Sequence, residues 1–400
     1  MSEETTIRQV FDPAIRHDPF PLYAELRKRP VHRDPSGSYV VSTYRDIVAL
    51  LHDPRLSSDV RKRGIHDAPV PPPFISIDPP EHDRLRSLAM AYFGPPHRPG
   101  LIAATEPRLR ELVEELIDGL ADKRRIDIVD DFAYPMPITM ICHLLGVPRE
   151  DERRFHGWAT DLVNNAGARF GPDAPGTQEL LRRGSKSVGE LSAYLAELVE
   201  RHRKDPGDDL ISGLATDGGM SDEDINSTAR LLLVAGHETT VNLIANGMLT
   251  LLRLPALLER LREDPELAVP LVEELLRFEP PVHMLPARTA IADIEVAGVT
   301  IPKGSGVNLV LASGSRDPAR FSDPERVDPE REDNQHLGFG GGIHYCFGAP
   351  LARLEAQIAL NALARRLENP RLVKDPPPYR LSPILRGPQQ LLVDVDGIRS

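Results

Sequence analysis

The chain of 400 residues has an ordinary globular composition, with 40% hydrophobic and 27% charged residues, which excludes disorder along its whole length. Its 48 basic and 60 acidic residues give a net charge of −12, which argues against general binding to nucleic acid or to an anionic membrane. The two cysteines, Cys142 and Cys346, exclude a disulfide framework and a four-thiolate zinc site. With no signal-peptide pattern and no long apolar stretch, we expect a soluble cytoplasmic protein.

The elements expected along the chain begin with a mixture of helix and strand. A short amphipathic helix at residues 21–28 precedes an apolar and turn pattern at residues 31–42 that is typical of a β-hairpin. A second helix at residues 44–52 leads into an irregular loop at residues 61–73, rich in Pro, Gly and charge. Loops of that length are often functional.

Helical periodicity dominates the rest of the chain. The Gly and Pro residues mark the ends of elements and do not divide the chain into parts of different composition, which predicts a single domain over residues 1–400. The fold class is therefore mainly α with a small β region. Helices are predicted over residues 81–93, 101–121, 136–145, 150–165, 179–203, 222–254, 256–264, 267–277 and 350–367, and short strands over residues 290–301, 306–311 and 389–395.

The most informative segment is HLGFGGGIHYCFGAPLAR, at residues 336–353. It holds Cys346 in a Gly-rich loop just before Pro350, which suits the first turn of a helix. The glycines allow the backbone to approach a flat ligand, and the helix start favours a thiolate, which could be a nucleophile, a redox group or a metal ligand. A buried cysteine that only fills space is the alternative. That alternative suits Cys142, which lies in an apolar helix, whereas the aromatic residues around Cys346 fit haem iron better than acyl transfer.

A long buried helix at residues 222–254 carries a second set of unusual residues. It begins with a capping-box pattern at Ser221 and Asp224. In its apolar middle, Gly236 costs about 1 kcal/mol relative to Ala, and Glu238 and Thr239 need partners. A structural explanation stays open, in which Thr239 bonds to the carbonyl one turn earlier and Glu238 forms an ion pair.

The loop matches the pattern Phe-x-x-Gly-x-His-x-Cys-x-Gly without a mismatch, and it resembles the proximal-ligand signature of the cytochrome P-450 haem-thiolate monooxygenases. The resemblance spans nearly the whole chain and implies the single-domain, mostly helical prism fold of that family. It makes Cys346 the axial ligand of a haem b (iron protoporphyrin IX). The cofactor-binding residues that it implies are His82, Arg86, Ala235, Gly236, Arg288, Phe339, Gly340, His344, Cys346 and Gly348.

The same resemblance assigns roles on both sides of the cofactor. Thr239 and Glu238 would be the catalytic acid–alcohol pair that relays protons to dioxygen, while His237 points away from the iron because adjacent helix positions do not share a face. The segment with His82 and Arg86 resembles the family's His-x-x-x-Arg segment, so both would bind haem propionates together with Arg288 and His344. A solvated charged face is the alternative for the His82 segment.

Supporting interactions are implied elsewhere in the chain. Glu274 and Arg277 match the family's Glu-x-x-Arg pair, with Arg326 as the candidate third member. The expected pocket walls are residues 61–77, 158–181, 282–287 and 383–385, with Leu233 and Val234. A basic docking patch, or equally a solvated helix face, is expected from Arg84, Arg98, Arg353, Arg365 and Arg366.

The function implied is a monooxygenase that inserts one atom of O2 into a C–H or C=C bond of a small apolar molecule, with a polyketide, macrolide or terpenoid as the prior. No flavin or dinucleotide fingerprint is present, so the electrons would come from a ferredoxin and a ferredoxin reductase. We expect a monomer that binds neither nucleic acid nor membrane. A peroxide-driven haem-thiolate enzyme and a haem-based binding or sensing protein without turnover are the alternatives.

Overall fold

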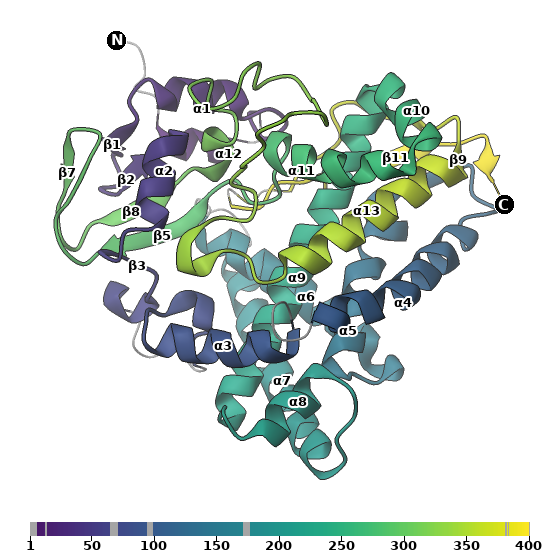
Figure 1. The fold of residues 1–400 in the computed structure, drawn as a ribbon, viewed down its shortest axis with the longest axis horizontal. Coiled ribbons are helices and arrows are strands. Elements are labelled where there is room, and N and C mark those ends of the chain that lie inside the picture. The colour runs from purple at the N-terminus through teal and green to yellow at the C-terminus, as the bar shows by residue number, and fades with distance from the viewer. Residues whose placement is uncertain are drawn as a thin grey trace.

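The structure is a computed structural model that describes residues 6–12, 14–64, 71–93, 99–170, 177–380, 382 and 384–399. Helices fill most of it (Figure 1), and those predicted from periodicity form close to their expected bounds. The helices are α1 (Phe20–Arg27), α2 (Tyr44–Leu51), α3 (Glu81–Phe93), α4 (Pro99–Asp118), α5 (Pro135–Leu145), α6 (Glu152–Phe170), α7 (Thr177–Lys204), α8 (Leu210–Asp217), α9 (Asp222–Arg253), α10 (Pro255–Glu263), α11 (Ala268–Phe278), α12 (Leu311–Gly314) and α13 (Ala349–Arg366).

The β structure is small, and its main part is a five-stranded sheet in the order β1-β2-β8-β5-β3. The predicted hairpin is confirmed by the antiparallel pairing of β1 with β2, whereas β2 runs parallel to β8. The strands are β1 (Val31–Arg33), β2 (Tyr39–Val41), β3 (Leu56–Ser57), β4 (Arg125–Asp127), β5 (Leu285–Ala290), β6 (Ile294–Val296), β7 (Val299–Ile301), β8 (Gly306–Leu309), β9 (Leu367–Glu368), β10 (Arg371–Leu372), β11 (Leu392–Asp394) and β12 (Gly397–Ile398).

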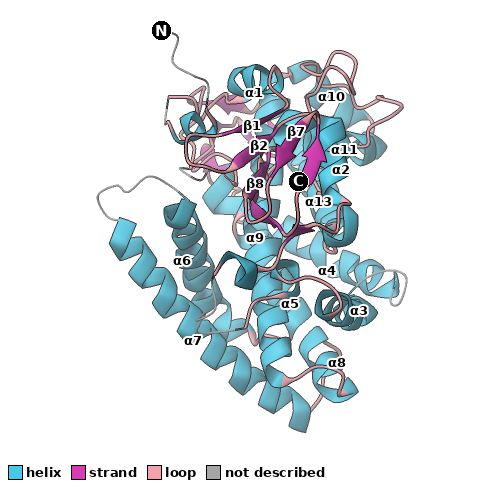
Figure 2. Cartoon of the chain, turned by 90° about the vertical axis from the view of Figure 1, so that its left-hand side faces the viewer, coloured by secondary structure: helices cyan, strands magenta, loops and turns pink. Residues whose placement is uncertain are grey.

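Helix α9 forms the axis on which the site is built. The predicted capping box is present, because Ser221 Oγ accepts the N–H of Asp224 at 3.1 Å and the Asp224 carboxylate accepts the N–H of Ser221 at 3.3 Å. The helix packs against α5, α7 and α13, and both views place it in the interior of the molecule (Figures 1 and 2). At 1.5 Å per residue it is about 48 Å long, so it links the strand-containing part to the helical part formed by α6 and α7 (Figure 2).

Some sequence predictions of elements are wrong. The strand expected at residues 290–301 is divided among β5, β6 and β7. Ala297 and Gly298, with φ of 49° and 75°, reverse the chain between β6 and β7. Helix α8 was missed, although Asp209 caps it through the N–H of Ser212 at 2.9 Å and Gly218 ends it with φ of 74°. In the loop expected at residues 61–73, a 3₁₀ turn occupies Val60–Arg63, and residues 65–70 lie outside the described part.

The helical core contains Cys142 as predicted. Its side chain is fully buried among apolar residues of α5, α6, α7 and α9, and burial raises the pKa of its thiol far above the usual value. Among the described helices, no single one is long and apolar enough to cross a membrane, although α9 and α10 together satisfy that test across a bend of 109°.

Candidate active site

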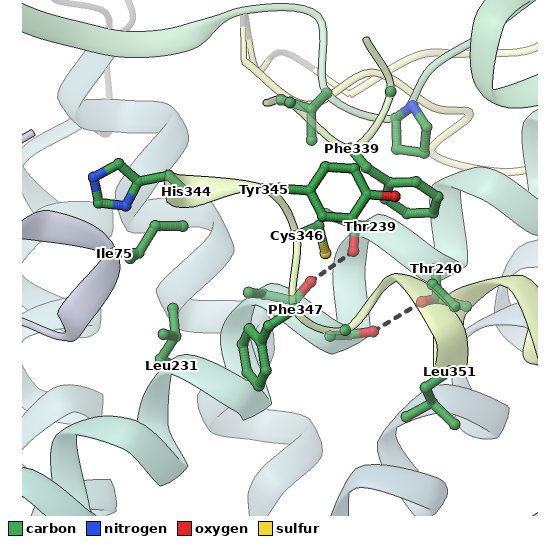
Figure 3. A pocket seen from close by; sticks show the side chains of 18 of the residues that line it. Ile75, Leu231, Thr239, Thr240, Phe339, His344, Tyr345, Cys346, Phe347 and Leu351 are labelled. Carbon is green, nitrogen blue, oxygen red and sulfur yellow. Dashed lines mark hydrogen bonds between the residues drawn. The ribbon is translucent and has the colours of Figure 1, made fainter. Parts of the chain in front are cut away.

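An apolar cavity separates the middle of α9 from the Cys346 loop (Figure 3). Together with the solvent at its open mouth, the cavity encloses about 1260 Å³ of empty space. Apolar side chains dominate its wall. Of the predicted catalytic pair, Thr239 lines the cavity and Glu238 does not. All the predicted cofactor-binding residues except His82 line it. These lining residues are Arg86, Ala235, Gly236, Arg288, Phe339, Gly340, His344, Cys346 and Gly348.

The Cys346 loop is held in one conformation by its own backbone. The N–H of Cys346 donates to the carbonyl oxygen of Phe339 at 3.0 Å, which closes the loop over the glycines. Gly342 has φ of 64° and passes so close to the carbonyl of Leu51 that a Cβ atom would collide with it. Only glycine meets both demands without strain, so this position of the motif is required by the fold.

Two forces act in opposite directions on the Cys346 thiol. Burial raises its pKa, while the N–H of Gly348 and the charges of Arg86 and Arg353 favour the thiolate. The net effect is a raised pKa, because burial outweighs these donors. This differs from the expectation that the helix start would favour the thiolate. A bound metal cation reverses this balance, because a coordinating thiol is deprotonated. The site therefore combines a protected thiol with donors that stabilise the charged form once a cation is present.

Arginine and histidine side chains gather beside the cavity; among the described residues Arg86 and Arg288 have no carboxylate partner, whereas His82 Nδ1 lies 2.7 Å from Asp83 Oδ1. The rings of His82 and His344 lie 4.4 Å apart, and His82 Nε2 and His344 Nδ1 are buried without a hydrogen-bond partner. Burial and, to a smaller extent, the charge of Arg288 lower the pKa of His344 to about 3, so its ring is neutral at neutral pH. Arg288 is buried and pairs with no described carboxylate, and Arg86 donates to the carbonyl of Tyr345 at 2.6 Å.

This cluster fits a haem. Buried cations and orphaned ring nitrogens are costly without an anionic partner, and the two propionates of haem supply that charge next to a thiol and a flat apolar space. The charged face of the His82 segment is not a solvated one, since the His82 side chain is 1% exposed.

Sequence reasoning missed Arg63, which belongs to the same group. It ends the turn at Val60–Arg63, its Nε is buried without a partner, and its charge lowers the pKa of Arg288. The sequence feature that could have identified Arg63 is its position in the long loop expected at residues 61–73, since loops of that length are often functional.

The residues of α9 divide between the cavity and the opposite side. Thr239 lines the cavity, and its hydroxyl donates to the carbonyl of Ala235 at 2.6 Å, while Thr240 donates to Gly236 at 3.0 Å (Figure 3). A Cβ at Gly236 would lie 2.9 Å from Ile141 Cδ1. The glycine therefore allows α5 to pack closely against α9, and it also leaves space at the cavity wall. His237 is buried against Tyr134, with its Nε2 3.1 Å from that carbonyl, which confirms that it points away from the cavity.

Glu238 lies behind this wall. Its carboxylate pairs with Arg380 and accepts a long hydrogen bond from Asn242 at 3.4 Å. Burial raises the pKa of Glu238, and Arg380 opposes that shift. The side chain of Arg380 is 22% exposed whereas that of Glu238 is 2% exposed, so the pair connects the centre of α9 with solvent. Both contacts of the structural explanation are therefore present: Glu238 forms an ion pair, and Thr239 bonds to the carbonyl one turn earlier.

The Glu274 and Arg277 pair is buried, and its third member differs from the prediction. Glu274 Oε1 and Arg277 Nη2 lie 2.8 Å apart, and both side chains are 0% exposed. Arg331 Nε reaches the other oxygen of Glu274 at 3.4 Å, whereas Arg326 contributes its backbone carbonyl to Arg277 at 3.0 Å. Arg326 was wrong as the partner because its own side chain is exposed at the surface of this segment.

The described arginines of the expected basic docking patch each have an acidic partner within the chain: Arg84 with Asp224, Arg353 with Glu273, and Arg365 and Arg366 with Glu114; Arg98 lies outside the described residues. The docking patch and the solvated helix face both stay predictions. Among the expected pocket walls, Leu233 and Val234 are wrong because the helix turns Leu231, Leu232 and Ala235 to the cavity instead. Phe74, Ile75, Val282 and Leu285 do line it, no described residue of 158–181 does, and residue 383 lies outside the described part.

Sequence reasoning also missed Glu355, a carboxyl group on the wall of the cavity. It lies four residues after Leu351 on the apolar face of α13, a placement that could have marked it. Its side chain is 2% exposed and Oε1 has no partner. Burial raises its pKa to about 8, although the hydroxyl of Thr240 favours the ionised form, so this carboxyl is protonated at neutral pH.

Replacing Glu355 by Gln is expected to flatten the pH dependence of stability. The pKa of Glu355 is near 4.5 in the unfolded chain and about 8 in the folded one, so between these values the folded state binds more protons and the wild type loses stability as the pH rises. The loss approaches about 1.4 kcal/mol per pH unit inside that window. Urea unfolding of both proteins at pH 5, 6.5 and 8 measures it, and parallel curves would contradict the protonated state.

A partly buried thiol in a closed loop, arginines without carboxylate partners beside it and a long helix across an apolar cavity define the architecture of a haem-thiolate protein. The sequence model of the cytochrome P450 family matches residues 34–395. The chain belongs to the cytochrome P450 family and is a monooxygenase of that family.

Individual proteins agree with this over almost the whole chain. The Vitamin D(3) 25-hydroxylase of Pseudonocardia autotrophica is 38% identical, with 99% of this chain and 98% of the relative covered. The 6-deoxyerythronolide B hydroxylase of Saccharopolyspora erythraea is 35% identical, with 98% and 100% covered. The solved structure of the bacillaene polyketide synthase cytochrome P450 PksS of Bacillus subtilis 168 superimposes with a TM-score of 0.87 at 34% identity and covers 96% of this chain and 99% of its own.

Proposed function

We propose that this cytochrome P450 binds haem b and inserts one atom of dioxygen into a C–H or C=C bond of an apolar small molecule, with electrons from a ferredoxin and its reductase. The observation that carries the proposal is that Cys346, Thr239, Arg86, Arg288 and His344 all line one apolar cavity. The monomeric state and the cytoplasmic location remain predictions.

The residues around the cavity would hold the cofactor in distinct ways. Cys346 would be the axial ligand, and the loop glycines Gly340 and Gly348 leave the face of the ring open. His82, Arg86, Arg288 and His344 would bind the propionates. When bound, a haem with a thiolate ligand supplies electron density that favours O–O cleavage.

The cavity wall supports an apolar substrate. Its lining includes Phe74, Ile75, Leu231, Val282 and Leu285. Such a surface excludes water, and apolar ligand area buried against it stabilises binding by ~25 cal/mol per Å². The names of the similar proteins refer to 6-deoxyerythronolide B, to a polyketide synthase and to vitamin D3. We therefore place the substrate among polyketides, macrolides or terpenoids.

Thr239 and Glu238 would deliver protons to the reacting oxygen. The Thr239 hydroxyl borders the cavity and donates to Ala235 in the empty site; rotation about χ1 would turn the same proton toward a ligand. Glu238, joined to the partly exposed Arg380, would resupply that proton from solvent.

The alternatives receive less support. A peroxide-driven enzyme is expected to offer a substrate carboxylate a cation on the α9 side of the cofactor. Among the described residues that line the cavity, the arginines are Arg86 and Arg288, and both serve the propionates in this proposal. A binding or sensing protein without turnover would not require Thr239 at the cavity wall.

The test is the replacement of Thr239 by Ala in the haem-loaded enzyme. A screen of apolar compounds for spin-state shifts of the ferric haem first supplies a substrate. Without the Thr239 hydroxyl, we expect NAD(P)H consumption through ferredoxin and reductase to continue while product per NAD(P)H falls severalfold and hydrogen peroxide rises. The control is Thr250→Ala, since Thr250 also bonds to the carbonyl one turn earlier in α9, at 2.8 Å, but is buried away from the cavity. Unchanged coupling in the Thr239 variant would remove this residue from the mechanism.

A further inference from the structure

Arg63 is brought next to the cofactor-binding arginine by the sheet. Strand β3 pairs with β5 so that Ser57 lies opposite Thr289, the neighbour of Arg288. The chain then turns at Val60–Arg63, where Asp59 accepts the N–H of Arg61 at 2.9 Å and Gly64, with φ of 82°, ends the turn. Arg63 is thus held in a turn six residues after Ser57, on the side of the sheet where β3 pairs with Thr289 and Ala290 next to Arg288.

The guanidinium of Arg63 has no described partner in the folded chain. Its Nε is buried and unbonded, and burial lowers its pKa. The neighbouring acids are engaged elsewhere. Asp59 holds Arg61 at 2.9 Å, and Asp78 holds Lys62 at 2.7 Å together with the backbone N–H of Ser58 at 2.9 Å.

Two cations placed in this way repel each other. Burial and, to a smaller extent, the charge of Arg63 lower the pKa of Arg288 to about 10, and the charge of Asp78 opposes that shift. Such a pair persists in a buried place when an anionic group lies between its members and accepts hydrogen bonds from both. The described residues supply no such anion, so the arrangement is complete only with a ligand that carries one.

We propose that Arg63 is an additional haem-binding residue, which pairs with the same propionate as Arg288. The inference rests on the haem assignment above. The residues that would bind the two propionates come from two parts of the fold. His82 and Arg86 belong to α3, and Arg86 also donates to the carbonyl of Tyr345 in the Cys346 loop. Arg63 and Arg288 belong to the β3 and β5 side. A propionate on that side receives two guanidinium groups.

The experiment measures the rate at which haem passes from the holoenzyme to excess apomyoglobin. The variants are Arg63→Gln and Arg63→Lys, and the matched control is Arg61→Gln, in the same turn, whose guanidinium is paired with Asp59 and Glu81. Loss of one charge-assisted hydrogen bond is expected to speed haem loss about tenfold in Arg63→Gln. Arg63→Lys should recover part of the difference, and Arg61→Gln should match the wild type. Far-UV circular dichroism verifies the fold of each variant.

A second arm separates binding from a purely structural role. The same proteins are reconstituted with haem dimethyl ester, whose propionates carry no charge, and Arg63→Gln should then lose the cofactor at the wild-type rate. A faster loss that persists with the ester would overturn the proposal, because the defect would lie in the turn. Unchanged haem loss together with weaker binding of a long-chain fatty acid would also overturn it, in favour of a substrate contact. A wild-type chain that binds no haem with a thiolate signature would instead refute the proposed function itself.

Discussion

Replacing Cys346 by Ser is expected to abolish monooxygenase turnover and to remove the thiolate signature of the ferrous carbon monoxide complex. A serine hydroxyl is a poor ligand for haem iron and does not supply the electron density of a thiolate. The loop itself should survive, because it is closed by the hydrogen bond from the backbone N–H of residue 346 to Phe339 and by the φ of Gly342. Turnover should therefore fall to background in a protein that keeps its helical circular dichroism.

The matched control for this variant is Cys142→Ala. Cys142 is fully buried in the helical core, so its loss creates a small cavity that costs roughly 1 kcal/mol and should leave the Soret band unchanged. A wild-type band at the position of imidazole-ligated haem, or a thiolate band that survives in Cys346→Ser, would show that Cys346 is not the ligand.

Replacing Glu274 by Gln is expected to cause the largest loss of stability of any single change considered. The carboxylate of Glu274 accepts two hydrogen bonds from Arg277 at 2.8 Å and the N–H of Asp328 at 2.8 Å, and it also faces Arg331. The neutral amide leaves two guanidinium groups without a counter-charge in a buried place, and breaking such a pair costs about 3–5 kcal/mol. Urea unfolding of the holoenzyme measures this cost.

The chain offers a control with the same spacing at the surface. Glu179 and Arg182 form an i,i+3 pair at 2.6 Å, with side chains 54% and 66% exposed, and exposed pairs of this kind contribute little to stability because water screens them. The urea unfolding curve of Glu179→Gln should therefore coincide with that of the wild type. If Glu274→Gln did the same, the buried pair would not be what holds the segment of Asp328 and Arg331 against α11.

Local signals explain why much of the site could be predicted. The glycines and the cysteine of residues 339–348 lie close together in sequence, and their backbone requirements are met by contacts such as the bond from Cys346 to Phe339. The turn of α9 around Thr239 was equally accessible, because helix spacing alone separates a residue such as His237 from the cavity face. Segments with weaker periodicity, such as α8, were missed because their caps rather than an apolar stripe define them.

Contacts between distant segments could not be predicted in the same way. Glu274 pairs with Arg331, whereas Arg326 contributes only its backbone carbonyl to Arg277. Which arginine reaches Glu274 depends on how the irregular segment that contains both residues packs over α11. The pairing of Arg353 with Glu273 requires α11 and α13 to lie together. In each case several arginines were available in the sequence, and which one is engaged was decided by packing.

By itself the sequence determined the class of this protein: a mainly helical chain with one thiol in a Gly-rich loop and an acid–alcohol pair in a long buried helix. These are properties of neighbouring residues, set by backbone geometry and helix periodicity. The tertiary structure alone decided where charge is left unpaired. It brings the half-buried Arg63 close enough to Arg288 to lower the pKa of that residue, joins Glu238 to Arg380 and holds Glu355 protonated at the cavity wall. Desolvation and long-range pairing arise only when segments far apart in the chain come together.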